Sequence, residues 1–204
     1  MRRIPLSRRS HITGFQPLLT GTAEHESVLE RDFVTRTSLL DPTASIISQP
    51  LTLRFRDGAR VRRYTPDFLV RWGNGRSRLI EVKYRADLRL RWDEYRPAFS
   101  AARAWAREQG ATFRIATERH IRDAALDNAK RLLPLRRAPF DSEAAARILG
   151  VIRDQATPTF ESALRGVPIR RQAALSALWR LIARGAVHVD LRAPIRPDTP
   201  LALP

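Results

Sequence analysis

Two short stretches of this sequence decide the fold: TPDFLV at residues 65–70 and LIEVK at residues 79–83. Each is rich in branched and aromatic apolar residues, as strands are, and the GNG at residues 73–75 is typical of a tight turn between them. We therefore expect the two stretches to pair as a β-hairpin. Since side chains alternate across a strand, Glu81 and Lys83 are expected on one face, with the residue between them in the core.

The hairpin is expected to gather a set of charged groups. Asp67 begins the first strand and is expected beside Glu81, so two carboxylates and the ammonium of Lys83 meet at one end of the sheet. Phosphodiester hydrolysis needs such a set, because carboxylate oxygens hold Mg²⁺ and an ammonium orients water or neutralises developing charge. The main-chain carbonyl of Val82 is a further candidate ligand. The alternative is a surface hairpin with an ion pair between Lys83 and one of the carboxylates, which contributes little.

The surrounding pattern predicts an α/β domain. Helices are expected over residues 22–40, 92–109 and 118–133. Strands are expected over residues 51–55, 64–72, 77–84 and 111–117. The order α-β-β-β-α-β-α favours a mixed sheet flanked by helices.

The C-terminal part predicts a second, smaller module. Helices are expected over residues 142–155, 159–165 and 170–184, followed by an alternating strand over 186–191. Three helices and a strand are the outline of a small winged helix-turn-helix module. The Pro-rich end of the chain is expected to be disordered.

The charge of the chain points to a polyanionic partner. The 204 residues include 37 Lys+Arg and 21 Asp+Glu, a formal net charge of +16. Such a surplus favours binding to nucleic acid or, less strongly, to an anionic membrane surface. The basic residues are mostly arginine, a bias that a GC-rich genome would also produce. Cysteine is absent, which excludes a disulfide scaffold, a Cys-ligated metal and a cysteine nucleophile. No apolar run approaches the ~20 residues of a membrane span.

The motif resembles that of a known nuclease superfamily. Pro66-Asp67 followed by Glu81-Val82-Lys83 resembles the PD-(D/E)xK motif, and the element order resembles the restriction-endonuclease-like core. Upstream, ESVLERDF at residues 26–33, LDP at 40–42 and SQP at 48–50 resemble the N-terminal domain of TnsA, the endonuclease subunit of heteromeric transposases.

The resemblance implies two further site residues. Glu30 matches a helix glutamate that faces the metal site in the family. Its alternative is a capping box, in which Ser27 and Glu30 bond reciprocally at the helix start. Gln49 matches a recurrent polar position that supports the site or touches DNA, and its alternative is a strand-entry residue.

The resemblance also implies an activity and its partners. The activity is hydrolysis of double-stranded DNA at the 5′ ends of a mobile element, with Mg²⁺ as cofactor and Mn²⁺ able to substitute. The implied metal ligands are Glu30, Asp67, Glu81 and Val82, with Lys83 completing the catalytic set. The implied partners are a DDE-type transposase subunit (TnsB-like) and an AAA+ ATPase regulator (TnsC-like), in the bacterial cytoplasm and on the nucleoid, with no membrane. A stand-alone restriction- or repair-type nuclease and a non-catalytic DNA-binding subunit remain alternatives.

Two groups of arginines are candidate DNA contacts. Arg54, Arg62 and Arg63 cluster around a hairpin ahead of the motif. Two interpretations of this cluster remain equally open: it binds phosphate, or it forms a solvated face. Arg170 and Arg171 lie at the start of the third C-terminal helix, where they would contact DNA. The alternative is that this module binds another protein. The aromatic residues at helical spacing from Trp92 to Trp105 are interpreted as core, and the histidines as structural or solvated.

Taken together, these observations predict five segments. They are a basic N-terminal arm (1–21), a PD-(D/E)xK endonuclease domain (22–133), a linker (134–139), a winged-helix-like domain (140–193) and a Pro-rich tail (194–204).

Overall fold

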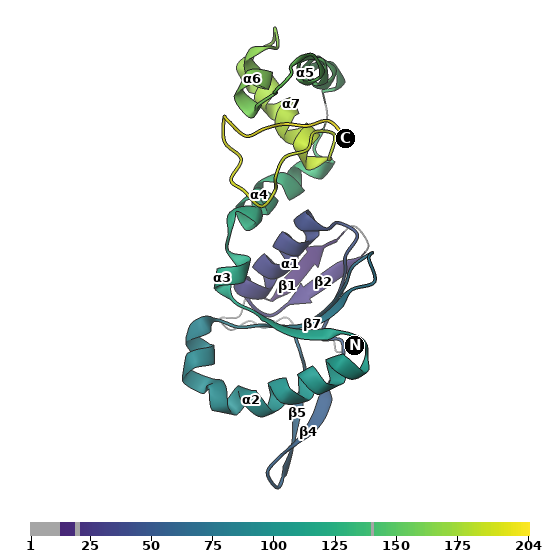
Figure 1. The fold of residues 1–204 in the computed structure, drawn as a ribbon, viewed down its shortest axis with the longest axis vertical. Helices are drawn as coiled ribbons and strands as arrows, with labels where there is room; N and C mark the ends of the chain where they lie inside the picture. Colours follow the sequence, from purple (N-terminus) through teal and green to yellow (C-terminus); the bar gives the residue numbers. More distant parts are fainter. Residues whose placement is uncertain (1–12, 19–20, 140) are drawn as a thin grey trace. The chain divides into compact units, whose positions relative to one another are not determined.

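The computed structural model describes residues 13–18, 21–139 and 141–204. The chain divides into two compact units, Met1–Asp123 and Ala124–Pro204 (Figure 1). Residues 1–12 of the expected basic arm lie outside the described residues. The expected linker at 134–139 largely coincides with a short 3₁₀ helix, η1 (Leu133–Arg137), which follows α4 (Ala124–Leu132) inside the second unit.

The first unit is built on a four-stranded mixed sheet. Its spatial order is β3-β6-β7-β8, with β6 antiparallel to β3 and β7, and β8 parallel to β7. The bounds are Ser45–Ser48 for β3, Phe68–Arg71 for β6, Ser77–Val82 for β7 and Thr112–Ala116 for β8. The mixed α/β architecture predicted from the sequence is therefore confirmed. Strand β3 was not expected, because its SIIS sequence is too short to show alternation.

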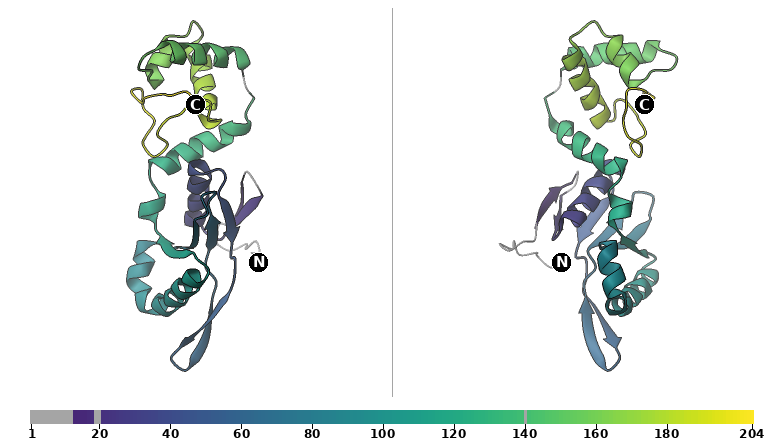
Figure 2. Two further views of the ribbon diagram at one scale, coloured as in Figure 1. Left: turned by 45° about the vertical axis from the view of Figure 1, so that its right-hand side comes forward. Right: turned by 90° about the vertical axis from the view of Figure 1, so that its left-hand side faces the viewer.

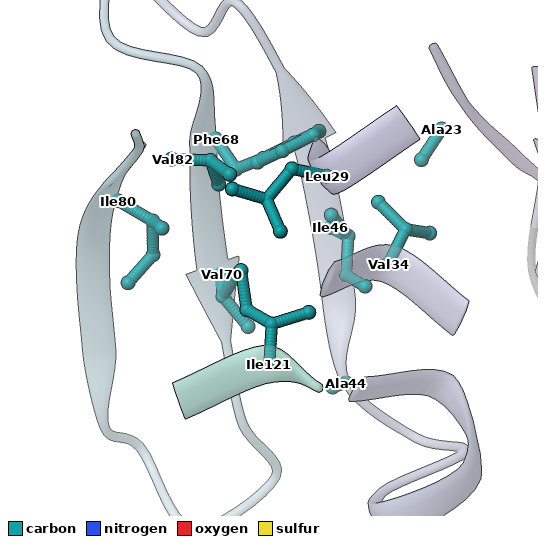
Figure 3. Close-up of a cluster of buried hydrophobic side chains, with 10 residues drawn as sticks. All are labelled: Ala23, Leu29, Val34, Ala44, Ile46, Phe68, Val70, Ile80, Val82 and Ile121. Atoms are coloured by element: carbon teal, nitrogen blue, oxygen red, sulfur yellow. The ribbon is translucent and has the colours of Figure 1, made fainter. Parts of the chain in front are cut away.

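One face of the sheet packs against α1 (Val28–Leu40) and the short helix α3 (Glu118–Ile121). Figure 3 shows Leu29 of α1 and Ile121 of α3 among the apolar side chains of the strands. Phe68, Val70 and Ile80 supply this face of the sheet and are almost completely buried. Burial of this apolar area, worth about 25 cal/mol per Å², holds the motif strands rigid.

The opposite face packs against the long helix α2 (Arg85–Glu108), which Figure 1 shows as a bent helix. Phe99 lies at the centre of this layer, against Leu79 of β7 and the ring of Tyr64. The backbone departs from helical geometry at Arg91, which accounts for the bend. The sequence predicted this helix only from residue 92, because its first turns carry arginines in place of a regular apolar stripe. Phe99 is core, as interpreted from the sequence, whereas Trp92 of the same aromatic set is 44% exposed.

Two β-hairpins complete the unit. Strands β1 (Gly14–Pro17) and β2 (Thr22–His25) pair with each other, so the expectation of a helix starting at residue 22 was wrong. The helix begins after Ser27, whose side chain caps it. Strands β4 (Leu53–Asp57) and β5 (Arg60–Tyr64) form a second hairpin that extends away from the sheet in both views of Figure 2.

The second unit is helical. After α4 and η1 it contains α5 (Ser142–Asp154), α6 (Phe160–Arg165) and α7 (Arg171–Ala183), close to the expected ranges. The strand expected over 186–191 is absent from the described residues there, where His188 forms only an isolated bridge to Ala202. The helix expected over 118–133 is divided into α3 and α4.

The end of the chain is packed, contrary to the expectation of disorder. Leu201 is 5% exposed, and its N–H donates to the carbonyl of Pro158. His188, which lies within the expected strand, bridges to Ala202 of the tail. No helix in the part of the chain that the structure describes is long and apolar enough to cross a membrane.

Candidate active site

The antiparallel register of β6 and β7 brings the two acidic residues of the motif to one edge of the sheet. Phe68 lies opposite Ile80, so Asp67 and Glu81 belong to the ends of neighbouring strands. The backbone N–H of Val82 donates to Oδ2 of Asp67 at 2.7 Å. This hydrogen bond fixes the Asp67 carboxylate against β7.

Glu81 is held by two donors. Lys83 Nζ lies 2.7 Å from its Oε1, and the hydroxyl of Tyr64 donates to its Oε2 at 2.5 Å. Only 3% of Glu81 is exposed, so both contacts act in a medium of low polarity. Lys83 Nζ also lies 3.5 Å from the carbonyl oxygen of Val82, so that carbonyl borders the same group of charges.

Crowding of the carboxylates changes their proton affinity. Burial raises the pKa of Asp67 well above its usual range, and the neighbouring charges of Glu81 and Glu30 raise this pKa further. Burial alone would lower the pKa of Lys83, but the three carboxylates outweigh it and raise this pKa overall. Lys83 is therefore an ammonium at neutral pH. Burial and Glu81 also raise the pKa of Tyr64, which stays a hydroxyl donor.

Glu30 forms the capping box that the sequence left open as one of its two interpretations. Its Oε2 accepts from the N–H of Glu26 at 2.8 Å and its Oε1 from the Ser27 hydroxyl at 2.8 Å, while Ser27 Oγ accepts from the N–H of Glu30. Glu30 is thus part of the helix cap. It also lies near enough to Lys83 for the ammonium to lower its pKa, although burial raises that pKa overall. Capping and proximity to the site coexist.

Gln49 is the strained residue of the region. Its φ of 43° lies in the left-handed region, which residues other than glycine seldom adopt. Its N–H donates to the carbonyl of Asp67 at 2.8 Å, and its side-chain amide donates to Glu26 at 2.9 Å. Its Oε1 is buried without a hydrogen-bond partner among the described residues. Gln49 therefore braces the start of β6 and leaves one oxygen to be satisfied by a ligand or water.

The carboxylates do not form a ready-made metal site. Among the residues described by the structure, no group of three or more His, Asp or Glu is arranged to hold an ion. The oxygens of Glu81 contact Lys83 and Tyr64, and those of Glu30 contact the helix cap. Coordination by Glu30 or Glu81 would therefore require these contacts to change.

The candidate DNA-contacting arginines of the first unit lie on the β4–β5 hairpin, on both of its faces. Arg54 and Arg63 are cross-strand partners on one face, whereas Arg62 shares the other face with Leu53 and Tyr64. Arg62 is paired with Asp57 at 2.9 Å. Only the face of Arg54 and Arg63 lacks a carboxylate in the hairpin.

The arginines of the second unit also differ from each other. Arg170 is the exposed residue that precedes α7. Arg171 forms an exposed ion pair with Glu161 at 2.7 Å. A DNA contact by Arg171 would compete with this pair.

Sequence reasoning missed Tyr64 as a site residue. It lies directly before the motif, at the end of the expected arginine hairpin, and its hydroxyl meets Glu81 although β5 pairs with β4 and not with β7. No local spacing rule would have found this contact.

The first unit thus has a mixed sheet with Asp67, Glu81 and Lys83 at one edge. Residues 41–118 match the family model described as TnsA-like endonuclease N terminal. The resemblance to TnsA-type endonucleases is thereby confirmed over these residues, which include Gln49 and the whole motif but not Glu30. No curated protein matches the chain.

Proposed function

We propose that this chain is the metal-dependent endonuclease subunit of a heteromeric transposase and hydrolyses phosphodiesters at the 5′ ends of a mobile element. The observation that carries the proposal is the clustering of Asp67, Glu81 and Lys83 at one sheet edge, within residues that match a TnsA-like endonuclease domain. The net charge of +16 suits a DNA substrate.

The chemistry of the donor set fits a divalent cation. Asp67, Glu81 and Glu30 bring three carboxylates to one region and Lys83 brings one ammonium, so negative charge is in excess where burial makes it costly. Gln49 adds a buried oxygen without a partner among the described residues, and Val82 adds a carbonyl. Hard oxygen donors of this kind suit Mg²⁺, with Mn²⁺ able to substitute.

Asp67, Glu81, Glu30 and the carbonyl of Val82 would hold the cation. When bound, it would supply positive charge to the scissile phosphate and acidify a nearby water. Lys83 is an ammonium and therefore donates to developing negative charge rather than accepting a proton. Tyr64 orients Glu81 through its hydroxyl, and Gln49 fixes the backbone that carries Asp67.

The β4–β5 hairpin would supply DNA contacts. A two-stranded ribbon fits the major groove of duplex DNA, and the exposed Arg54 and Arg63 face outward from one side of it. Arg62 would contribute less, because Asp57 already neutralises it. Arg170 is the better candidate contact of the second unit, since Arg171 is paired with Glu161.

The resemblance supplies the proposed partners. A DDE-type transposase subunit would cut and join the 3′ ends, and an AAA+ ATPase would regulate both activities. A stand-alone nuclease of the restriction or repair type would use the same residues, and a non-catalytic DNA-binding subunit would use only the basic surfaces.

One experiment separates these functions. Duplex DNA carrying the ends of the encoding element is labelled at the 5′ ends and incubated with the full chain and Mg²⁺, with and without the transposase and ATPase encoded beside it. We expect cleavage only in the complete mixture, and none after chelation of Mg²⁺. Cleavage of plain duplex by the chain alone would favour the stand-alone nuclease. Normal 5′ release with an Asp67→Ala chain would leave only the non-catalytic function.

A further inference from the structure

A basic cavity opens in the first unit beside the motif. Its volume is about 360 Å³. Arg85, Arg89 and Leu88 line it from the first turns of α2, and Thr117, Arg119 and His120 line it from α3 and the residue before it. Three guanidinium groups and one imidazole therefore face a single hollow.

The topology of the sheet explains where the cavity lies. Strands β7 and β8 run parallel, with Val82 opposite Ala116, so the segments that follow the two strands leave the sheet at the same edge. Arg85 follows Lys83 by two residues beyond the end of β7, and Thr117 directly follows β8. Ligands of open α/β sheets bind outside the carboxyl ends of parallel strands, which is the position of this cavity.

The positive charge of the cavity is largely uncompensated. Arg89 and Arg119 are exposed, and neither forms an ion pair with a carboxylate of the described residues. No acid lines the cavity in the part of the chain that the structure describes, and Glu118, between Thr117 and Arg119 in sequence, accepts from the backbone N–H of Arg85 through its Oε2 at 3.0 Å. Three guanidinium groups in this lining leave a site that prefers an anion.

We propose that this cavity binds a backbone phosphate of the DNA strand next to the phosphate that is cut. The planar guanidinium groups match the tetrahedral phosphate oxygens with paired hydrogen bonds. The exposed His120 ring adds a smaller donor, while the Thr117 hydroxyl is bonded to Nδ1 of that ring at 3.0 Å. Because Arg85 follows Lys83 by two residues, a strand that passes the motif reaches the cavity without leaving the sheet edge. The identity of the neighbouring phosphate rests on the proposed nuclease function.

The test compares two double variants with the same charge change. Arg89→Ala/Arg119→Ala empties the cavity of its two exposed guanidinium groups. Arg76→Ala/Arg107→Ala removes two exposed arginines elsewhere in the unit, one in the turn before β7 and one at the end of α2. Equal melting temperatures for both variants and the parent establish that each folds.

The measurement is the affinity of the full chain for duplex DNA carrying an element end, with Ca²⁺ in place of Mg²⁺, over a range of salt concentrations. The cavity variant should bind about tenfold more weakly and lower the slope of log Kd against log salt by about 1. The control should keep the slope of the parent. Equal losses in both variants would overturn the proposal, because they would reflect net charge alone.

Ethylation of individual phosphates then locates the contact. We expect one phosphate whose ethylation weakens DNA binding by the parent and the control but not by the cavity variant. This phosphate should flank the cut position. Identical interference patterns for all three proteins would overturn the proposal. If one phosphate loses its effect but no cleavage is ever found with the partners present, the nuclease function fails while phosphate binding stands.

Discussion

The hydroxyl of Tyr64 donates to Oε2 of Glu81 at 2.5 Å, while Lys83 contacts the other oxygen of the same carboxylate. A residue of the arginine hairpin thus orients an acid of the nuclease motif. Such supporting hydrogen bonds restrict a ligand to one rotamer and tune its charge. They also connect the proposed DNA-contacting ribbon to the proposed metal site.

Tyr64→Phe is expected to weaken metal-dependent cleavage by about 10–100-fold and to raise the Mg²⁺ concentration needed for half-maximal rate. The ring keeps its contact with Phe99, so the melting temperature should change little. Tyr95→Phe is the matched control, since Tyr95 stacks on the same ring and its hydroxyl has no hydrogen bond to the described residues. An unchanged Mg²⁺ dependence in Tyr64→Phe would contradict the positioning role.

Two substitutions separate the two roles of Glu30. Ser27→Ala removes the helix cap and should cost about 1 kcal/mol of unfolding free energy while cleavage continues. Glu30→Gln keeps an oxygen for the N–H of Glu26 but loses the charge, so cleavage should fall at least about 100-fold with a smaller loss of stability. Denaturant unfolding and strand cleavage measure the two effects. Parallel losses in both variants would assign Glu30 to the cap alone.

Asp67→Asn is expected to stabilise the metal-free protein. Burial and the neighbouring carboxylates raise the pKa of Asp67 in the folded chain, so its ionised form is disfavoured there. Stability is therefore lost as the pH rises from the ordinary Asp range through the raised pKa. At pH 7 we expect a gain of ~1 kcal/mol, a rise in Tm of about 2–4 °C, and below about pH 4 no difference.

Added Mg²⁺ should reverse the order of stability. A cation that binds only the folded state raises the Tm of the natural chain but not that of Asp67→Asn. Thermal melts with and without Mg²⁺ test both expectations. A lower Tm for the metal-free variant at pH 7 would show that the crowded carboxylate is not strained.

The two faces of the β4–β5 hairpin are expected to contribute differently to DNA binding. Arg54→Ala/Arg63→Ala should lower the salt slope of DNA binding by about 2, whereas Arg60→Ala/Arg62→Ala on the other face should change it less. Like charges directly opposite each other destabilise a ribbon, so the first variant should also gain ~0.2–1 kcal/mol of stability. Fluorescence anisotropy and thermal melts measure the two quantities. Equal slope changes from both faces would refute a DNA-facing side.

Much of the first unit could be predicted because its signals are local. The β6–β7 hairpin follows from apolar strands around a glycine turn, and this pairing alone brings Asp67 to Glu81. The helix start at Val28 was misplaced because Thr22–His25 is used as a strand, a choice made by its pairing with β1. Tertiary pairing overrode the local pattern there.

The contacts that sequence could not supply are those between distant segments. Leu201 is buried within the second unit although it lies in a Pro-rich tail, because Pro158 and His188 offer backbone partners to Leu201 and Ala202. The cavity likewise depends on the parallel pairing of β7 and β8, which brings Arg85 and Arg119 together. Neither arrangement can be predicted from the spacing of residues along the sequence.

The most direct measurement is the single-turnover rate of 5′-strand cleavage by Asp67→Asn in Mg²⁺ with the transposase partners present. If Asp67 holds the catalytic cation, the variant should remain folded and lose at least about a thousand-fold in rate, the loss expected for several kcal/mol of charge stabilisation. A rate within a fewfold of the natural chain would contradict the assignment of this carboxylate cluster as the DNA-cutting site.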